Sequence, residues 1–205
     1  MYGHGITTLM LAEASGTTRD DELEDKLRRA VERAVAVTVR ASEARKYAGH
    51  EGGWRYSQSD DQSDLSGTGW QIMSLHAARQ IGVLAPEKIF ADAAAYAKRL
   101  TAVDGKVGYQ AVGQDSPALR GVALMCLMIA GQRDAPEITR IADRIVAEPI
   151  TWQGAWFFYR AYYEAVGLNR AAPEHWELYA PRLEAILVEK QNPDGTWLSL
   201  IHISE

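Results

Sequence analysis

The side chains best suited to chemistry in this sequence are aromatic. Trp152, Trp156, Tyr159 and Tyr163 recur every three or four residues, and that spacing places them on one stripe of a helix. Aromatic faces stabilise cations, and aromatic rings also fill space between packed helices. The stripe therefore predicts either a ligand-facing wall or core packing. Trp70, in a separate apolar segment, is a further candidate to face a cavity.

The remaining reactive side chains do not predict a metal or cofactor site. Cys126, the only cysteine, lies in an apolar run, which favours a buried and inert thiol. Asp60, Asp61 and Asp64 could offer carboxylates to Ca²⁺, but they lack the spacing of an EF-hand. We expect instead a polar loop in which Asp64 or Ser66 caps the next helix. The sequence has no Ser-His-Asp pattern, phosphate-binding glycine loop or zinc-finger spacing.

Two kinds of helical segment, which would have to position these side chains, alternate along the chain. Amphipathic helices are predicted at 22–44, 86–101, 136–148 and 173–191, and helices that are apolar nearly all round at 6–15, 66–81, 118–130 and about 152–166. A helix that is apolar on every side is buried on several sides. The alternation therefore predicts an all-α fold with an outer layer of helices around an inner layer.

Two short patterns recur and indicate helix-pair repeats. Ala-Pro-Glu occurs at 85–87, 135–137 and 172–174, each time a few residues after a glycine. Glycine favours the end of a helix and proline the first turn of the next. An aromatic turn, usually with glycine, recurs at Trp54, Tyr109, Trp152 and Trp197, at spacings of 55, 43 and 45 residues. Such spacings are typical of stacked helix pairs.

Composition and charge exclude some classes of function. The 205 residues carry a formal net charge of -5, so a basic nucleic-acid-binding surface is not expected. The sequence has no run of about eighteen apolar residues, so no transmembrane helix is predicted. The last eight residues, Leu198–Glu205, match the translation of a transposon-type sequencing adapter. We expect them to be an artefact, and residues 1–197 to form the natural domain.

Two stretches resemble a known family. Arg182, Leu187, Gln191, Gly195 and Trp197 fit most of the QW motif of squalene-hopene cyclases, although Leu183 and Ile186 depart from it. The stretches 52–56 and 68–71 are similar to the prenyltransferase/squalene oxidase repeat proteins of bacteria. This resemblance implies an α/α-toroid, here a partial ring of about three and a half helix hairpins with a central hollow.

The resemblance also implies two active chemistries, and the sequence matches neither fully. Class II cyclases of the family protonate an alkene with the acid of a DxDD motif. The nearest match runs from Gln58 to Asp61, with Asp60 as the implied proton donor and Asp61 as its neighbour. Gln58 stands where the first Asp belongs, and the loop looks solvated. Protein prenyltransferases hold zinc with an Asp-x-Cys pair, which Cys126 lacks.

We therefore expect a repeat domain without a catalytic motif, which binds a protein partner or an apolar ligand on its concave face. The alternative is a fragment of a class II terpene cyclase of the squalene-hopene type, and the aromatic stripe supports that alternative. On the first hypothesis the protein is a scaffold. On the second it is part of an isomerase.

Overall fold

The computed structural model describes residues 1–148, 150–153 and 156–197. Within them the chain forms eight α-helices and one short 3-10 helix, and the described residues form isolated β-bridges but no strand. The elements are α1 (Tyr2–Ser15), α2 (Asp21–Ser42), α3 (Leu65–Gln80), α4 (Glu87–Arg99), η1 (Pro117–Leu119), α5 (Arg120–Ile129), α6 (Pro136–Ala147), α7 (Phe157–Ala171) and α8 (Pro173–Lys190). The predicted all-α class is confirmed.

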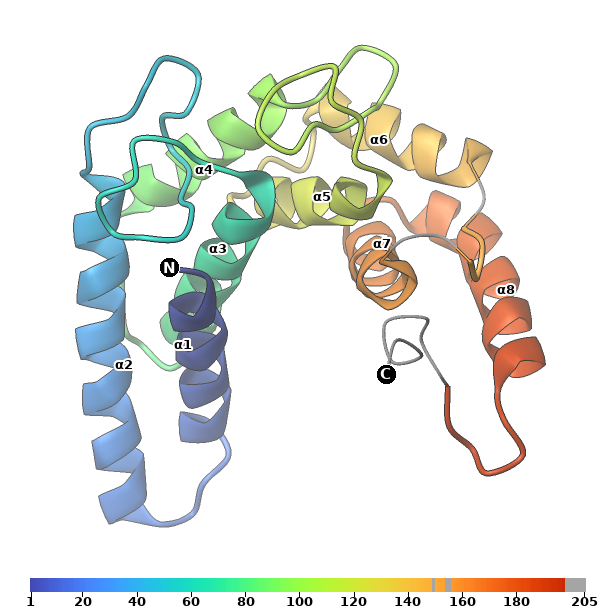
Figure 1. The fold of residues 1–205 in the computed structure, drawn as a ribbon. Coiled ribbons are helices and arrows are strands. Elements are labelled where there is room, and N and C mark those ends of the chain that lie inside the picture. The colour runs from blue at the N-terminus through green and yellow to red at the C-terminus, as the bar shows by residue number, and fades with distance from the viewer. Residues whose placement is uncertain (149, 154–155, 198–205) are drawn as a thin grey trace, which may run out of the picture.

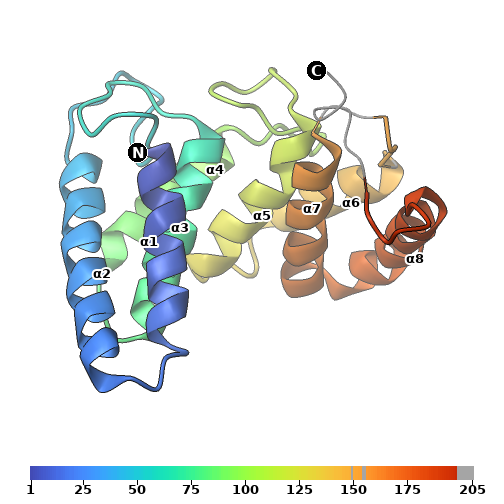
Figure 2. The ribbon, with the colours of Figure 1, turned by 60° about the horizontal axis from the view of Figure 1, so that its bottom comes forward.

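The helices form an arch with an inner and an outer row (Figures 1 and 2). Helices α1, α3, α5 and α7 pack against one another in that order along the inside of the arch. Helices α2, α4, α6 and α8 lie outside them, and each contacts at least one inner helix. The concave side of the arch is therefore lined by the odd-numbered helices.

Burial follows the position of each helix in the arch. In α5, near the middle, every residue from Arg120 to Leu127 is buried, whereas α8 buries only Tyr179 and Leu183. Helix α1 was expected to be apolar nearly all round and buried on several sides, but Ile6 and Met10 are exposed. The reason is positional: α1 is the first helix of the inner row, so one of its sides has no neighbouring inner helix among the described residues.

The predicted helix ends are confirmed in two of three cases. Gly82 and Gly131 follow α3 and α5 with positive φ angles of 80° and 72°. Pro136 and Pro173 open α6 and α8 as predicted. Gly167, however, does not end a helix, because α7 continues to Ala171.

The recurring turn has a different register from the predicted one. The amide of Asp64 donates to the carbonyl of Trp54 at 3.0 Å, and the amide of Ser116 donates to the carbonyl of Val107 at 2.7 Å. Trp54 and Val107 are both buried. Val107, rather than the expected Tyr109, is therefore the counterpart of Trp54. A buried apolar residue, not an aromatic ring, is what the position requires.

Candidate functional site

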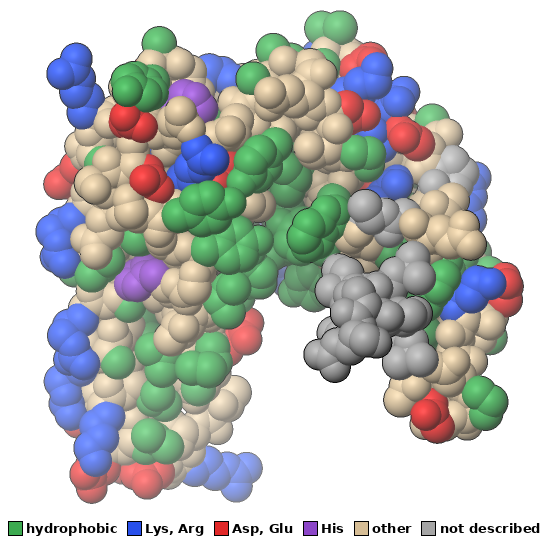
Figure 3. Space-filling model, viewed as in Figure 1, with side chains coloured by type: hydrophobic (Ala, Val, Ile, Leu, Met, Phe, Trp, Pro, Cys, Tyr) green, Lys and Arg blue, Asp and Glu red, His purple; other side chains and the backbone are tan. Residues whose placement is uncertain are grey.

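A pocket of about 520 Å³ opens where the N-terminal ends of the inner helices meet. That volume lies in the range of small-molecule sites. Tyr2 comes from α1, Ser66 from α3, Ala118 and Leu119 from η1, and Tyr159 from α7; Tyr56, Tyr109, Ser116 and Trp156 come from the connecting segments. Hydrophobic side chains also gather in the middle of the concave face (Figure 3). Among the described residues, none of those that line the pocket carries a formal charge.

A chain of touching rings surrounds this pocket. The Tyr56 and Tyr109 hydroxyls lie 3.0 Å apart, and the Tyr2 ring lies 6.4 Å from that of Tyr56 and 6.1 Å from that of Trp70. Trp70 in turn meets Tyr163 edge to face at 6.1 Å. These separations are typical of favourable aromatic pairs. The rings therefore hold one another in place around the hollow.

The predicted helical stripe is only partly correct. Tyr159 and Tyr163 do share one side of α7, with ring centroids 4.6 Å apart. Helix α7 begins at Phe157, so Trp152 and Trp156 precede it rather than belong to it. Trp152 packs on Phe157 with centroids 4.8 Å apart and does not line the pocket.

Core packing of Trp156 is excluded by its position. Its side chain is 64% exposed, its backbone is left-handed with φ of 64°, and it stands at the rim of the pocket. Of the five predicted ligand-facing residues, Trp156 and Tyr159 line the pocket. Trp70 and Tyr163 support it from behind through their ring contacts.

The rings near the pocket are uncharged. Burial raises the pKa of both Tyr159 and Tyr163 well above the ordinary value of a phenol. Burial, followed by the hydrogen bond with Tyr56, also raises the pKa of Tyr109. The indole Nε1 of Trp70 is buried without a hydrogen-bond partner in the described residues. The site therefore offers apolar ring faces with few polar groups.

Three tyrosines line the pocket although the sequence did not predict it: Tyr2, Tyr56 and Tyr109. A signal for two of them was present in the recurring turn. Tyr56 follows the buried Trp54 by two residues, and Tyr109 follows the buried Val107 by two. The corrected register of the turn would have paired these two tyrosines.

Asp60, the candidate proton donor, holds a loop together. Its carboxylate accepts hydrogen bonds from the amides of Tyr56 and Ser57, each at 2.7 Å, and from the Ser57 hydroxyl at 2.8 Å. The bonds from Ser57, then Tyr56, lower the pKa of Asp60 below its ordinary value. The acid that protonates an alkene must be neutral, whereas these hydrogen bonds favour the ionised form of Asp60.

The neighbouring acids also have local contacts. The backbone carbonyl of Asp61 accepts a hydrogen bond from the Tyr47 amide at 2.8 Å, and the nearby Asp61 carboxylate raises the pKa of the Tyr47 hydroxyl. Asp64 is fully buried and accepts from the Gly67 amide at 2.7 Å and from the Ser66 hydroxyl at 2.8 Å. The prediction that Asp64 caps the next helix is confirmed.

The residues of the QW-like motif bind one another at the end of α8. The indole of Trp197 donates to the carbonyl of Leu187 at 2.8 Å, and the amide of Gln191 donates to the carbonyl of Gly195 at 3.0 Å. Arg182 donates to the carbonyl of Val146 in α6. These contacts are structural. The suspected adapter-derived tail, Leu198–Glu205, lies outside the described residues.

The described part of the chain shows neither a cluster of metal ligands nor a helix that could span a membrane. Burial raises the pKa of the Cys126 thiol to about 12, and no three His, Cys, Asp or Glu side chains gather there as a metal site would need. None of the described helices combines the length and the apolar character needed to cross a bilayer.

Comparisons with known proteins add no family: no family model matches the chain, and no curated protein matches it significantly.

Proposed function

We propose that this protein binds an apolar, uncharged small molecule in the aromatic pocket. The observation that supports the proposal is the convergence of Tyr2, Tyr56, Tyr109, Trp156 and Tyr159 on one hollow from separate segments of the chain. Rings that served only as core would be buried. Tyr56 and Trp156 are instead 57% and 64% exposed, which suits rings that cover a ligand.

The lining favours a particular ligand chemistry. Ring faces attract apolar and unsaturated groups, and the absence of a formally charged lining residue disfavours an ionic ligand. The hydroxyls of Ser66 and Ser116 and the paired hydroxyls of Tyr56 and Tyr109 offer hydrogen bonds to one polar group. A long unsaturated alcohol combines these features.

We also propose that the arch is a partial α/α-toroid of the prenyltransferase/squalene oxidase repeat type. The two rows of helices and the shared turn around Trp54 and Val107 support this assignment. Within that class the chain is better described as a binding domain than as a piece of a class II cyclase. The hydrogen bonds of Asp60 are the reason, because the donors from Tyr56 and Ser57 favour its ionised form and so disfavour a role as proton donor.

The test is a titration of the protein with farnesol, in which isothermal titration calorimetry measures the affinity. Trp156→Ala and Tyr56→Ala should each weaken binding about tenfold, because aromatic residues that cover a ligand contribute at least that much. Tyr47→Ala is the matched control, since Tyr47 is 59% exposed and lies outside the pocket. Equal affinity in all three variants, or no binding of farnesol to the unaltered protein, would refute the proposal.

A further inference from the structure

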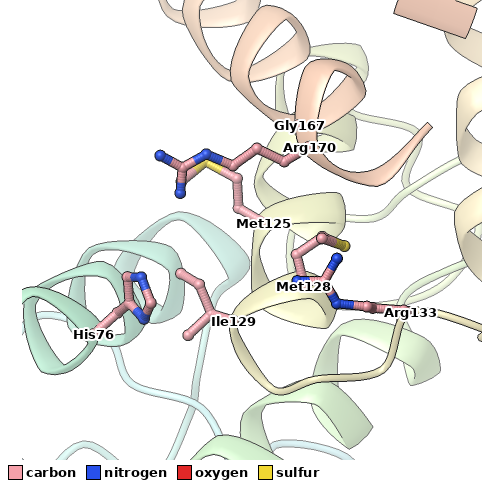
Figure 4. A pocket seen from close by; sticks show the side chains of 7 residues that line it. All are labelled: His76, Met125, Met128, Ile129, Arg133, Gly167 and Arg170. Carbon is pink, nitrogen blue, oxygen red and sulfur yellow. The ribbon is translucent and has the colours of Figure 1, made fainter. Parts of the chain in front are cut away.

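A second hollow lies at the opposite ends of the inner helices (Figure 4). A cavity of about 310 Å³ is bounded by the last turns of α3, α5 and α7. Met125, Met128 and Ile129 form an apolar wall, and Arg133, Arg170 and His76 stand around it. This site shares no lining residue with the aromatic pocket.

The two arginines of this cavity have no internal counter-charge. Neither Arg133 nor Arg170 forms an ion pair or a side-chain hydrogen bond with any described residue, and both are exposed. By contrast, Arg120 binds Asp115 and Glu148 at 2.8 and 2.9 Å. The guanidinium groups of the cavity therefore remain available to a ligand.

His76 also lines the cavity, and an imidazole cannot neutralise the two arginines because it carries no negative charge. Burial, followed by the positive charges of Arg79 and Arg170, lowers the pKa of His76 below its ordinary value. Its Nδ1 lies 3.2 Å from an Arg79 nitrogen. Glu13 lines the adjoining groove, but it forms no ion pair with Arg170. The cavity keeps a positive balance.

Interaction with helix dipoles does not explain this arrangement fully. A basic residue in the last turn of a helix is favoured by the partial negative charge there, and Arg170 occupies that position in α7. Arg133 follows the end of α5 and comes from a different segment, yet it reaches the same cavity. Two guanidinium groups that border one apolar wall fit an anionic group attached to an apolar chain.

The space for that chain is present as well. A groove of about 470 Å³ adjoins the cavity and shares Met125, Ile129 and Arg170 with it. Leu9, Met73 and Val166, from three different inner helices, continue its apolar lining. Methionine side chains adapt to flexible chains at little cost.

We propose that the cavity and groove bind an anionic amphiphile, with an alkyl chain along the groove and a carboxylate or phosphate headgroup between Arg133 and Arg170. This goes beyond the proposed function, because the site lies at the other end of the inner helices and selects a charged ligand rather than a neutral one.

The test compares laurate, dodecyl phosphate and dodecanol by isothermal titration calorimetry, all below the concentrations at which they form micelles. The double variant Arg133→Gln/Arg170→Gln should weaken binding of the anionic ligand about tenfold or more, because two charge-assisted contacts are lost. Binding of dodecanol should not change. Arg33→Gln is the matched control, since Arg33 is an exposed residue of α2 outside both cavities.

The outcomes separate the two sites and the two headgroups. Tight binding of laurate alone would assign a carboxylate headgroup, and of dodecyl phosphate alone a phosphate headgroup. Binding of neither, equal affinity for dodecanol, or unchanged affinity in the double variant would overturn the proposal. Farnesol binding that depends on Tyr56 but not on the arginines would leave the proposed function intact in each of these cases.

Discussion

The contact between α5 and α7 allows a sharp test of the inner row of helices. Gly121 lies in the first turn of α5 against the backbone of α7. A Cβ atom at this position would lie 2.1 Å from the carbonyl carbon of Tyr163, 2.2 Å from its oxygen and 2.4 Å from the nitrogen of Glu164. Contacting heavy atoms normally stay about 3.5–4.0 Å apart. Gly121→Ala can therefore be accommodated only if the two helices separate.

The expected cost of Gly121→Ala follows from that separation. Overpacking of a well-packed contact costs about 1–3 kcal/mol, and the upper end applies because the opposing atoms are backbone and cannot rotate away. Alanine recovers less than about 1 kcal/mol of helix propensity near a helix end. We expect a net loss of about 2–3 kcal/mol in the free energy of unfolding. For a chain of this length that corresponds to roughly 4–12 °C in Tm.

Two further glycines provide graded controls. The stability of all three variants is measured by circular dichroism at 222 nm during urea and thermal unfolding. Gly69→Ala would bring its Cβ within 2.5 Å of one side-chain atom, Cγ1 of Val122, which can shift. We expect a loss of about 1 kcal/mol. Gly3→Ala, in α1, meets nothing within 4 Å and should change stability by less than about 0.5 kcal/mol. If Gly121→Ala were as stable as Gly3→Ala, the close packing of α5 on α7 would be wrong.

Three other predictions concern single side chains. Asp64→Ala should lower the free energy of unfolding by about 2 kcal/mol in urea titrations, because the buried Gly67 amide loses its acceptor; Ser57→Ala, in the exposed loop, should have little effect. Burial raises the pKa of Glu148, but Arg120, together with Arg144 and Arg160, outweighs this and the net pKa lies below the ordinary 4.5. The stability lost in Glu148→Gln should therefore be present above pH 4.5 and disappear as the pH falls below it, and a loss that persists in acid would contradict the ion pair. Cys126, fully buried, should react with a thiol reagent at neutral pH only after denaturation, so rapid labelling of the native protein would be inconsistent with this structure.

The positions of the amphipathic helices could be predicted closely from sequence. The expected ranges 22–44, 86–101, 136–148 and 173–191 agree with α2, α4, α6 and α8 to within two residues at each end. The period of their apolar positions is a local property, and their charged faces mark where it starts and stops. The apolar segment predicted at about 152–166 was shifted by five residues from α7. The apolar segments predicted at 66–81 and 118–130 agree with α3 and α5 to within two residues, so the shift is particular to α7, which begins only after the left-handed backbone of Trp156.

The candidate site could be predicted only in part. Tyr159 was identified because it shares a helix side with Tyr163, and local spacing fixes that relation. Tyr2 and Tyr109 were not identified, because their approach depends on how α1 and the segment before η1 meet across the arch. The exposure of Trp156 likewise depends on a left-handed backbone at the start of α7.

Sequence patterns were enough to predict that the chain is helical, that one-sided and apolar helices alternate, and that either Asp64 or Ser66 caps a helix. Each of these rests on contacts between residues close in the chain. Contacts across the fold were needed to show which rings line a hollow, which arginines have no partner among the described residues, and why α7 continues past Gly167, where the helix lies against Leu124 of α5. These features depend on contacts between distant segments, and a periodic pattern does not specify the separation or rotation at which two helices pack.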